Sequence, residues 1–316
     1  MRAPALGLAA LAPAPDGLAQ VPPVTWGSLL GRAEAVLGRG MEARWVLERA
    51  SGMGGAELVA ALDEVAPVRS VAWCHDMVRR RCLGEPLQYV LGRWGFRELD
   101  LLVDRRVLIP RPETEILVEV ARAELARLRE IGHSDGRDGR DLVAVDLGTG
   151  SGAIALSLAA EEPGLAVWAT DLTSDALAVA RANLAGLPTR AAAAVRLVRG
   201  DWYGALPTEL EGALDLVVSN PPYVGEGEDL PAEVAAWEPR SALVAGPEGL
   251  ESIRAIVTRA PAWLRRPGAL VVEIAPHQAS PALALAVAAG FDSAEVRPDL
   301  VGRPRVLVAR AERATG

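Results

Sequence analysis

The sequence contains no lysine, so arginine supplies all 33 of its basic residues, and 41 acidic residues leave a formal net charge of −8. A protein that holds nucleic acid by bulk electrostatic attraction needs a basic face. The charge balance argues against such a protein, although it leaves room for a small basic patch and suits a basic partner. No nucleic acid is expected as a direct partner.

Cysteine and histidine are scarce as well. The two cysteines, Cys74 and Cys82, form no CxxC pair, and the three histidines are scattered at positions 75, 133 and 277. Zinc sites need Cys and His ligands at short, regular spacings, so no metal site is predicted. An isolated histidine is usually structural or solvated, so none of the three is predicted to act as a general base.

Long hydrophobic runs are also missing. No uninterrupted apolar segment reaches the length of about 18 residues expected of a membrane-spanning helix, so no membrane partner is expected. The first 24 residues are rich in alanine and proline and carry a single arginine. Prolines interrupt their apolar stretch and the chain has no disulfide framework, which argues against a secretory signal. We predict a disordered tail over residues 1–24 and a cytoplasmic location.

The rest of the chain divides into three parts. Over residues 25–88, apolar residues recur at three- and four-residue spacing between glycines, which predicts a small helical domain. Over residues 89–110, partly alternating apolar residues with Gly and Asp breaks predict a β-hairpin connector. Residues 111–316 are predicted to form the largest domain.

Strand, turn and helix alternate from residue 142 onward. Apolar strands end near residues 146, 171, 199 and 219, and a fifth is predicted over residues 269–275. Two further strand-like segments, around residues 294–296 and 306–309, close the chain as an antiparallel hairpin. This alternation predicts an α/β fold of Rossmann-like type, with an open, mainly parallel, seven-stranded sheet and helices on both faces.

A glycine-rich loop follows the first of these strands. The stretch "DLGTGSGAIAL", residues 146–156, places Gly148, Gly150 and Gly152 between a strand and a helix. Glycine is needed where the backbone turns tightly and where a ligand approaches the main chain. The spacing is G-x-G-x-G, not the G-x-G-x-x-G of the dinucleotide fingerprint. The alternative is a tight turn without a ligand.

Candidate ligand-binding residues follow the next two strands. Asp171, in "WATDLTSDAL", can accept hydrogen bonds from both hydroxyls of a ribose. Its alternative role is a helix N-cap, but Thr173 or Ser174 can cap that helix equally well. Trp202, in "GDWY", can stack beside an adenine, and its alternative role is core packing.

The fourth strand ends in an unusual way, in the stretch "DLVVSNPPYV" of residues 215–224. Two consecutive prolines cannot extend a sheet, because neither has an N–H to donate. A plain strand terminator would not account for the amide of Asn220 and the ring of Tyr223 on either side of them. The carboxyl ends of parallel strands meet at one edge of a sheet. The four features together therefore predict an adenosyl ligand whose reactive group points at Asn220.

These motifs resemble those of class I S-adenosylmethionine-dependent methyltransferases. The Asn-Pro-Pro-Tyr form is similar to that of enzymes that methylate a planar amide or amino nitrogen. More narrowly, "GEPLQYVLGRWGF", "IPRPETE" and "EPRSAL" resemble the HemK/PrmC family. That family methylates N5 of the glutamine in the Gly-Gly-Gln motif of peptide chain release factors. The resemblance runs from about residue 25 to residue 310, and residues 109–115 carry its most specific stretch.

The resemblance implies a role for each motif in binding S-adenosylmethionine. The loop that binds its methionine part would consist of Gly148, Thr149, Gly150, Ser151 and Gly152. Asp171 would hold the ribose hydroxyls, and Trp202 would flank the adenine. Asn220 would contact both the cofactor and the substrate. Where many relatives have glycine, this chain has Ala275, which affects local detail only.

The resemblance also implies how the substrate glutamine is held. The side-chain oxygen of Asn220 and the backbone oxygen of Pro221 would accept the two hydrogens of the target amide. Tyr223 would pack on the flat amide, and Pro222 would complete the substrate-binding motif. The helical domain over residues 25–88 would dock the release factor.

Other functions stay open from the sequence. A sister enzyme that methylates a glutamine of a ribosomal protein would share the motif. An adenine-N6 or guanine-N2 nucleic-acid methyltransferase also acts on a planar nitrogen, but the net charge argues against it. A non-catalytic binding module would be expected to have lost Asn220 or the glycines. The acidic stretch over residues 225–239 is predicted to be a loop, either a mobile rim or simply solvated.

Overall fold

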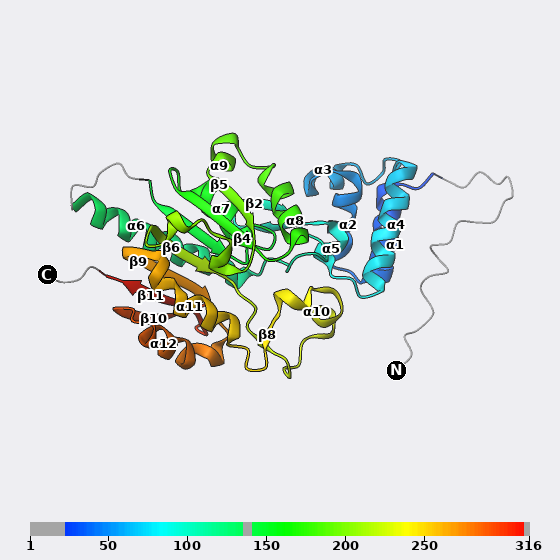
Figure 1. Cartoon of the computed structure of the whole chain (residues 1–316). Coiled ribbons are helices and arrows are strands. Elements are labelled where there is room, and N and C mark those ends of the chain that lie inside the picture. The colour runs from blue at the N-terminus through cyan, green and yellow to red at the C-terminus, as the bar shows by residue number, and fades with distance from the viewer. Residues whose placement is uncertain (1–22, 135–140, 313–316) are drawn as a thin grey trace. The chain divides into compact units, whose positions relative to one another are not determined.

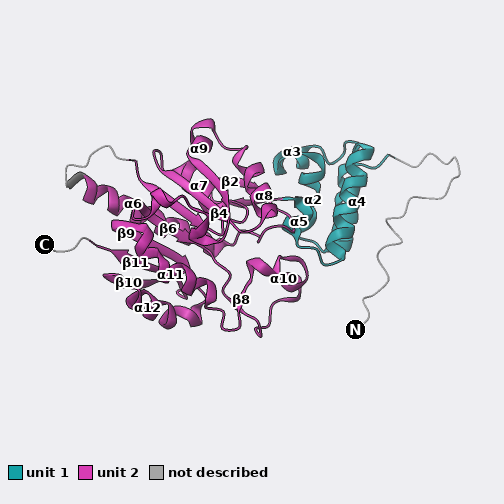
Figure 2. Cartoon of the chain, in the orientation of Figure 1, with its two compact units in different colours: residues 1–92 teal, residues 93–316 magenta. Residues whose placement is uncertain are grey.

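The computed structural model describes residues 23–134 and 141–312. It divides the chain into two compact units, Met1–Gly92 and Arg93–Gly316, which Figure 2 shows in different colours. All but the last two residues of the tail predicted over 1–24 lie outside the described residues. Within the described ranges, no helix is both long and apolar enough to cross a membrane.

The first unit is helical in its described part (Figure 1). Its helices are α1 (Trp26–Leu37), α2 (Met41–Ser51), α3 (Gly55–Ala60), α4 (Val68–Cys82) and α5 (Leu87–Leu91). The hydroxyl of Thr25 caps α1 by accepting a bond from the Ser28 amide, because the first N–H groups of a helix have no partner within it. Leu29, Leu47 and Met77 come from three of these helices and are almost fully buried, so one face of each forms the core.

The second unit begins with an antiparallel hairpin and continues into a seven-stranded sheet. The hairpin consists of β1 (Arg93–Phe96) and β2 (Leu99–Leu102), and α6 (Pro112–Ser134) follows it. The sheet has the order β10-β11-β9-β6-β3-β4-β5. Its strands are β3 (Val143–Leu147), β4 (Ala166–Asp171), β5 (Val195–Arg199), β6 (Leu214–Ser219), β9 (Leu264–Glu273), β10 (Ser293–Pro298) and β11 (Pro304–Ala311). The predicted α/β fold with this sheet is confirmed.

Helices lie on both faces of the sheet, because its strands are apolar on both sides. Every residue of β6 is buried. On one face Val145 and Leu147 of β3 share a core with α11 (Glu251–Trp263) and α12 (Ala279–Ala288). Asp146 points to the other face, where α7 (Ala153–Glu161) begins. Two further helices are α8 (Ser174–Leu184) and α9 (Thr189–Ala193).

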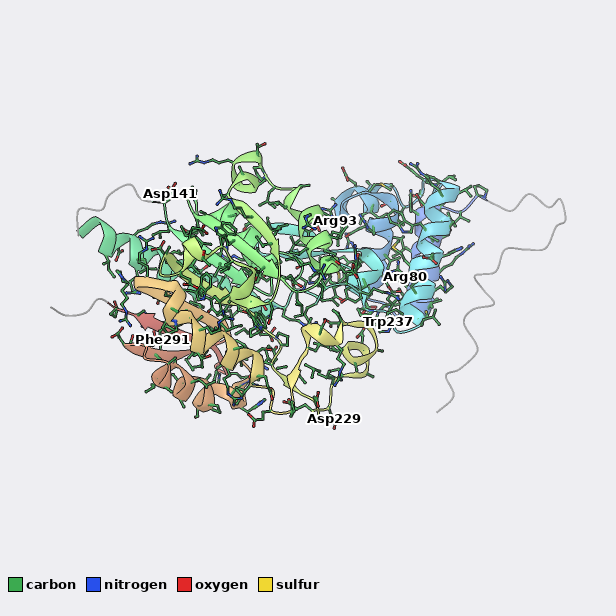
Figure 3. All side chains as sticks on the ribbon, in the orientation of Figure 1. Arg80, Arg93, Asp141, Asp229, Trp237 and Phe291 are labelled. Carbon is green, nitrogen blue, oxygen red and sulfur yellow. The ribbon has the colours of Figure 1, made fainter. Side chains whose placement is uncertain are left out.

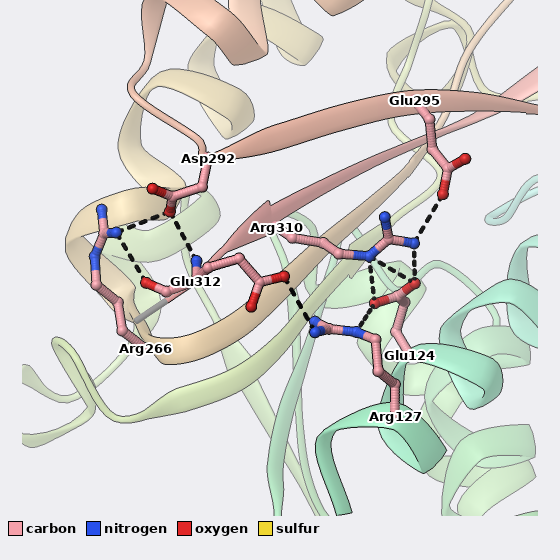
Figure 4. A network of polar contacts seen from close by, with 7 residues as sticks. All are labelled: Glu124, Arg127, Arg266, Asp292, Glu295, Arg310 and Glu312. Carbon is pink, nitrogen blue, oxygen red and sulfur yellow. Dashed lines mark hydrogen bonds and ion pairs between the residues drawn. The ribbon is translucent and has the colours of Figure 1, made fainter. Parts of the chain in front are cut away.

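Helix α6 is tied to the antiparallel edge of the sheet by buried charges (Figure 4). Glu124 accepts hydrogen bonds from Arg310 of β11 and from Arg127 of its own helix. Arg310 also contacts Glu295 of β10. A buried carboxylate needs such partners, because burial without them destabilises the charge.

Two expected segments differ in the structure. The acidic stretch predicted as a loop over residues 225–239 begins at the last residue of β7 (Val224–Gly225) and contains the short helix α10 (Ala232–Trp237), which starts after Pro231 (Figure 3 labels Asp229 and Trp237). The loop prediction is therefore wrong over α10. Pro231 does not prevent this helix, because proline is tolerated at the start of a helix. Strand β9 begins at Leu264, five residues before its predicted start at residue 269. It passes through the cis bond between Arg266 and Pro267.

Candidate active site

A pocket of about 290 Å³ lies at the carboxyl ends of β3, β4, β5 and β6, within the second unit. This is the edge at which open α/β sheets bind ligands. Eight of the residues predicted for the site line it: Gly148, Thr149, Gly150, Ser151, Asp171, Trp202, Asn220 and Pro222. The other three, Gly152, Pro221 and Tyr223, are next to lining residues in the chain but are not part of the lining.

The three glycines of the loop have left-handed backbones, with φ of +76° at Gly148, +56° at Gly150 and +87° at Gly152. Side chains are disfavoured at such angles. A Cβ on Gly152 would lie 2.9 Å from Leu156 Cδ1, whereas a Cβ on Gly150 would meet no protein atom within 4 Å. Gly152 is therefore needed for packing, while Gly150 has open space above its main chain at the pocket.

Asp146 lies beneath this loop and is fully buried. Its Oδ2 accepts bonds from the Thr149 hydroxyl (2.6 Å) and from the Ala155 N–H (3.2 Å). Its Oδ1 has no hydrogen-bond partner among the described residues. Burial raises the pKa of Asp146 to about 7, although the two hydrogen bonds oppose the shift. Asp146 thus connects the loop to the start of α7.

Asp171 ends β4 and faces the glycine loop. Its Oδ2 accepts the Gly150 N–H at 2.9 Å, and its Oδ1 accepts the backbone N–H and the hydroxyl of Thr173. Thr173 is the residue that caps α8, since its hydroxyl accepts the Ala176 N–H. Each carboxylate oxygen can accept more than one bond, so Asp171 retains capacity toward the pocket that it lines.

Trp202 begins a 3-10 turn (Trp202–Ala205) after β5, with φ of +45°. A bulky residue seldom adopts such an angle, and strain of this kind is concentrated at functional sites. The indole ring lies over the glycine loop, where a Cβ on Gly148 would come within 3.2 Å of it. The ring is partly buried against the core and also lines the pocket, so its packing role does not remove it from the pocket surface.

Asn220 is held by a chain of two hydrogen bonds that the sequence did not reveal. Its Nδ2 donates to Thr114 Oγ1 at 3.1 Å, and Thr114 Oγ1 donates to Glu273 Oε2 at 2.8 Å. Thr114 comes from the first turn of α6 and Glu273 from the end of β9. Burial raises the pKa of Glu273 to about 7, against the opposing effects of the Thr114 bond and of the Arg305 charge.

The backbone after the two prolines is held by the side chain of Gln278, which follows β9 in the chain. Gln278 Nε2 donates to the carbonyls of Tyr223 (2.8 Å) and Gly249 (3.0 Å). Gln278 Oε1 accepts the Ala275 N–H at 3.0 Å, so all of its polar atoms hold backbone. Burial raises the pKa of the Tyr223 phenol to about 12, so this ring stays neutral at physiological pH.

Two ion pairs hold the segment just before Thr114, at Arg111 and at Glu113. The buried carboxylate of Glu238 accepts the Ile109 N–H at 3.2 Å and an Arg111 N–H at 2.5 Å. Glu113 is paired with Arg303, between β10 and β11, at 3.3 Å. These contacts fix the segment that leads into Thr114, which lines the pocket.

Thr114, Glu273, Asp146 and Gln278 are the residues at this site that the sequence did not single out. Thr114 lies inside "IPRPETE" and Asp146 begins "DLGTGSGAIAL", while Glu273 and Gln278 lie close to Ala275, where this chain differs from many relatives. Their positions in or near these motifs could have marked them as candidates, but the sequence does not show which group each side chain contacts. Among the described residues, no group of three or more His, Cys, Asp or Glu side chains is placed to hold a metal ion.

Comparisons with known proteins place the chain in a family. Residues 28–92 match the PrmC N-terminal domain and residues 135–236 the Methyltransferase small domain. A release factor glutamine methyltransferase of Burkholderia pseudomallei is 39% identical over 280 residues, which cover 87% of this chain and 90% of that protein. One of Bordetella pertussis is 40% identical over 268 residues, covering 84% and 93%.

Among solved structures, a protein-(glutamine-N5) methyltransferase (release factor-specific) of Alicyclobacillus acidocaldarius is 27% identical. It covers 65% of this chain and 95% of its own, with a TM-score of 0.36. The sequence relatives alone establish the assignment, because each matches at well over 30% identity along most of both chains. The chain belongs to the HemK/PrmC family of release factor glutamine methyltransferases.

Proposed function

We propose that this chain transfers a methyl group from S-adenosylmethionine to the side-chain amide nitrogen, N5, of the glutamine in the Gly-Gly-Gln motif of class-one peptide chain release factors. One observation carries the proposal. The Asn220 amide uses its Nδ2 on Thr114, so its oxygen is left to accept from a substrate at the pocket. The names of the related proteins agree with it.

The pocket suits S-adenosylmethionine in shape and chemistry. A methyl group on Gly150 would meet no protein atom within 4 Å, as expected where a ligand approaches the backbone. Asp171 offers acceptor oxygens for ribose hydroxyls, and Trp202 offers an indole face for adenine. The five loop residues from Gly148 to Gly152 would hold the methionine part. When bound, the cofactor supplies an electrophilic methyl group on a positively charged sulfur.

The residues of the Asn-Pro-Pro-Tyr motif would act on the glutamine. A carboxamide nitrogen is a poor nucleophile, because its lone pair is delocalised into the carbonyl. The Asn220 and Pro221 oxygens would accept its two N–H bonds, which fixes the nitrogen and stabilises the positive charge that grows on it. Proline suits this position because its fixed φ keeps the carbonyl direction rigid.

The surroundings of this motif favour positioning over acid–base chemistry. The Gln278 clamp holds the Tyr223 backbone, while Pro222 lines the pocket and Tyr223 would pack on the flat amide. Positioning of two reactants can lower a barrier by about 7–11 kcal/mol in favourable cases. No general base is required before transfer, since the nitrogen can release its extra proton afterwards.

We further propose the domain roles that the sequence predicted. The helical segment 25–88 would dock the release factor, residues 89–110 would connect, and residues 111–316 would bind the cofactor. The match of residues 28–92 to the PrmC N-terminal domain supports a family-specific role for that segment. A substrate of translation termination would place the enzyme in the cytoplasm.

The test is methyl transfer from labelled S-adenosylmethionine to a purified release factor, with the modified peptide located by mass spectrometry. We expect a methyl on the Gly-Gly-Gln glutamine, lost when that glutamine is replaced in the substrate. Asn220→Ala should lower kcat by about 10²–10³-fold, as removal of one transition-state hydrogen-bonding group does. Transfer to a ribosomal protein or to nucleic acid, and none to the release factor, would refute the proposed substrate.

A further inference from the structure

We propose that Thr114 and Glu273 form a relay that fixes which way round the Asn220 amide sits, so that Asn220 presents oxygen and not its NH2 group to the substrate nitrogen. This inference rests on the proposed function, because it concerns a substrate that donates hydrogen bonds. It names two positioning residues, which act on the reaction through Asn220.

The two ends of an asparagine amide have the same shape but opposite hydrogen-bonding character. An amide turned by 180° would offer Nδ2 to the substrate, and two NH2 groups would then face each other. The site therefore needs a feature that distinguishes oxygen from nitrogen. Pro221 cannot supply it, since its backbone carbonyl has no alternative orientation of this kind.

The direction of the hydrogen-bond chain supplies the distinction. An ionised Glu273 only accepts, so the single hydroxyl hydrogen of Thr114 must point to it, at 2.8 Å. Thr114 Oγ1 can then only accept from Asn220, at 3.1 Å, which requires Nδ2 on that side. Glu273 thus determines the orientation of an amide that it does not touch.

Burial makes this chain of two hydrogen bonds rigid. Thr114 is 4% exposed and Glu273 1% exposed, so water has little access to replace either bond. The two residues come from α6 and β9 and are 159 positions apart in the sequence. The charges that face Glu273 are Arg305 of β11 and Arg111, which favour the ionised form, and Glu113, which opposes it.

The test is a set of variants assayed for kcat, KM and S-adenosylmethionine Kd. Thr114→Val keeps the shape but removes the hydroxyl, and we expect kcat to fall about tenfold, equivalent to ~1.4 kcal/mol of transition-state stabilisation. The cofactor Kd should stay within about threefold, since the variant leaves the glycine loop, Asp171 and Trp202 unchanged, and these would make most of the cofactor contacts. Thr114→Ser should restore most of kcat. Thr258→Val removes an exposed hydroxyl on α11 and is the matched control.

Glu273→Gln separates the relay from a merely structural role. Glutamine can donate to Thr114, so Thr114 can then donate to Asn220 and the amide can turn round. We expect a fall in kcat similar to that of Thr114→Val, and no further fall in the double variant, because Glu273 acts only through Thr114. Additive losses in the double variant would overturn the relay, and so would full activity of Thr114→Val.

A second readout does not depend on turnover. In protein with labelled asparagine, the Asn220 side-chain NH2 resonances should shift with a midpoint near pH 7 as Glu273 ionises. The shift should disappear in Glu273→Gln and in Thr114→Val, and its persistence in both would overturn the relay. If wild-type enzyme fails to methylate a release factor, the proposed function fails by itself. The relay is then judged by these resonances and by the variants on whichever substrate is methylated.

Discussion

Replacing either of two neighbouring glycines of the proposed cofactor loop by alanine should have different main effects. At Gly150 the main effect should be lost cofactor affinity, and at Gly152 it should be lost stability. Gly150 and Gly152 both have left-handed backbones, so alanine at either costs about 1–2 kcal/mol. In a unit of this size each kcal/mol lowers Tm by about 2–4 °C. A methyl group on Gly150 would meet no protein atom within 4 Å, so Gly150→Ala should destabilise by the backbone term alone.

Gly152→Ala adds a packing cost. The new Cβ would lie 2.9 Å from Leu156 Cδ1 and 3.1 Å from its Cγ, which is closer than such atoms pack. Overpacking of this kind costs about 1–3 kcal/mol, so Tm should fall clearly further than in Gly150→Ala. Cofactor affinity should change in the opposite order. Only the Gly150 methyl projects into the pocket, and we expect its S-adenosylmethionine Kd to rise at least about tenfold.

Both properties are measured on the same samples, by thermal unfolding without ligand and by titration calorimetry with S-adenosylmethionine. The Gly152→Ala variant is the control for general damage to the loop. If Gly150→Ala bound the cofactor as tightly as wild type, the methionine part could not lie against Gly150. If both variants lost the same stability, the contact with Leu156 would not have the energetic role assigned to it.

Two further predictions concern buried carboxylates. Burial tends to raise the pKa of Glu124, but its bonds to Arg310 and Arg127 outweigh this and the pKa is lowered, so Glu124→Gln should lose about 2–3 kcal/mol at neutral pH. Urea unfolding should show this loss shrinking as pH falls below 4.5, because the unfolded chain is protonated there first and the folded group only at lower pH; a pH-independent loss would contradict it. The pKa of Asp146 is raised from 3.8 to about 7, chiefly by burial, so the folded protein binds this proton more tightly than the unfolded chain does. The protonated carboxyl therefore favours the folded state, and this contribution is lost as pH rises from 3.8 to about 7. Asp146→Asn should therefore gain stability relative to wild type between pH 4 and pH 7, and a difference that stays constant over this range would refute the shifted pKa.

The sheet could be predicted from the sequence because its signal is local. Runs such as Leu214–Ser219 are mostly apolar, and each is followed by a polar or glycine-rich turn. The glycines of residues 148–152 could be located for the same reason. The helix α10 could not, because six residues after Pro231 show too little periodicity to separate a helix from a loop.

The support of the site was beyond reach because it depends on tertiary pairs. In the sequence, Glu238 is one of several carboxylate residues between positions 225 and 239, and nothing local shows that it is buried against Arg111 and Ile109, almost 130 positions away. Gln278 likewise looks like an ordinary residue after a strand. Its function follows from the carbonyls of Tyr223 and Gly249, which only the fold brings to it.

The strand order explains why the relay and the recognition motif meet. In the order β9-β6-β3, β9 lies directly beside β6, so Glu273 at the end of one strand is adjacent to Asn220 after the other. The glycine loop and Asp171 lie on the other side of β6, after β3 and β4, where they face the cofactor position. Asn220 therefore lies between two parts of the structure. One part is the proposed cofactor site, and the other is built from residues 109–115 and β9. This arrangement would give a physical reason for the family specificity that the sequence predicted for "IPRPETE". In the proposed relay, Thr114 of this stretch orients the Asn220 amide that would accept from the substrate nitrogen, whereas the cofactor loop would have no such role.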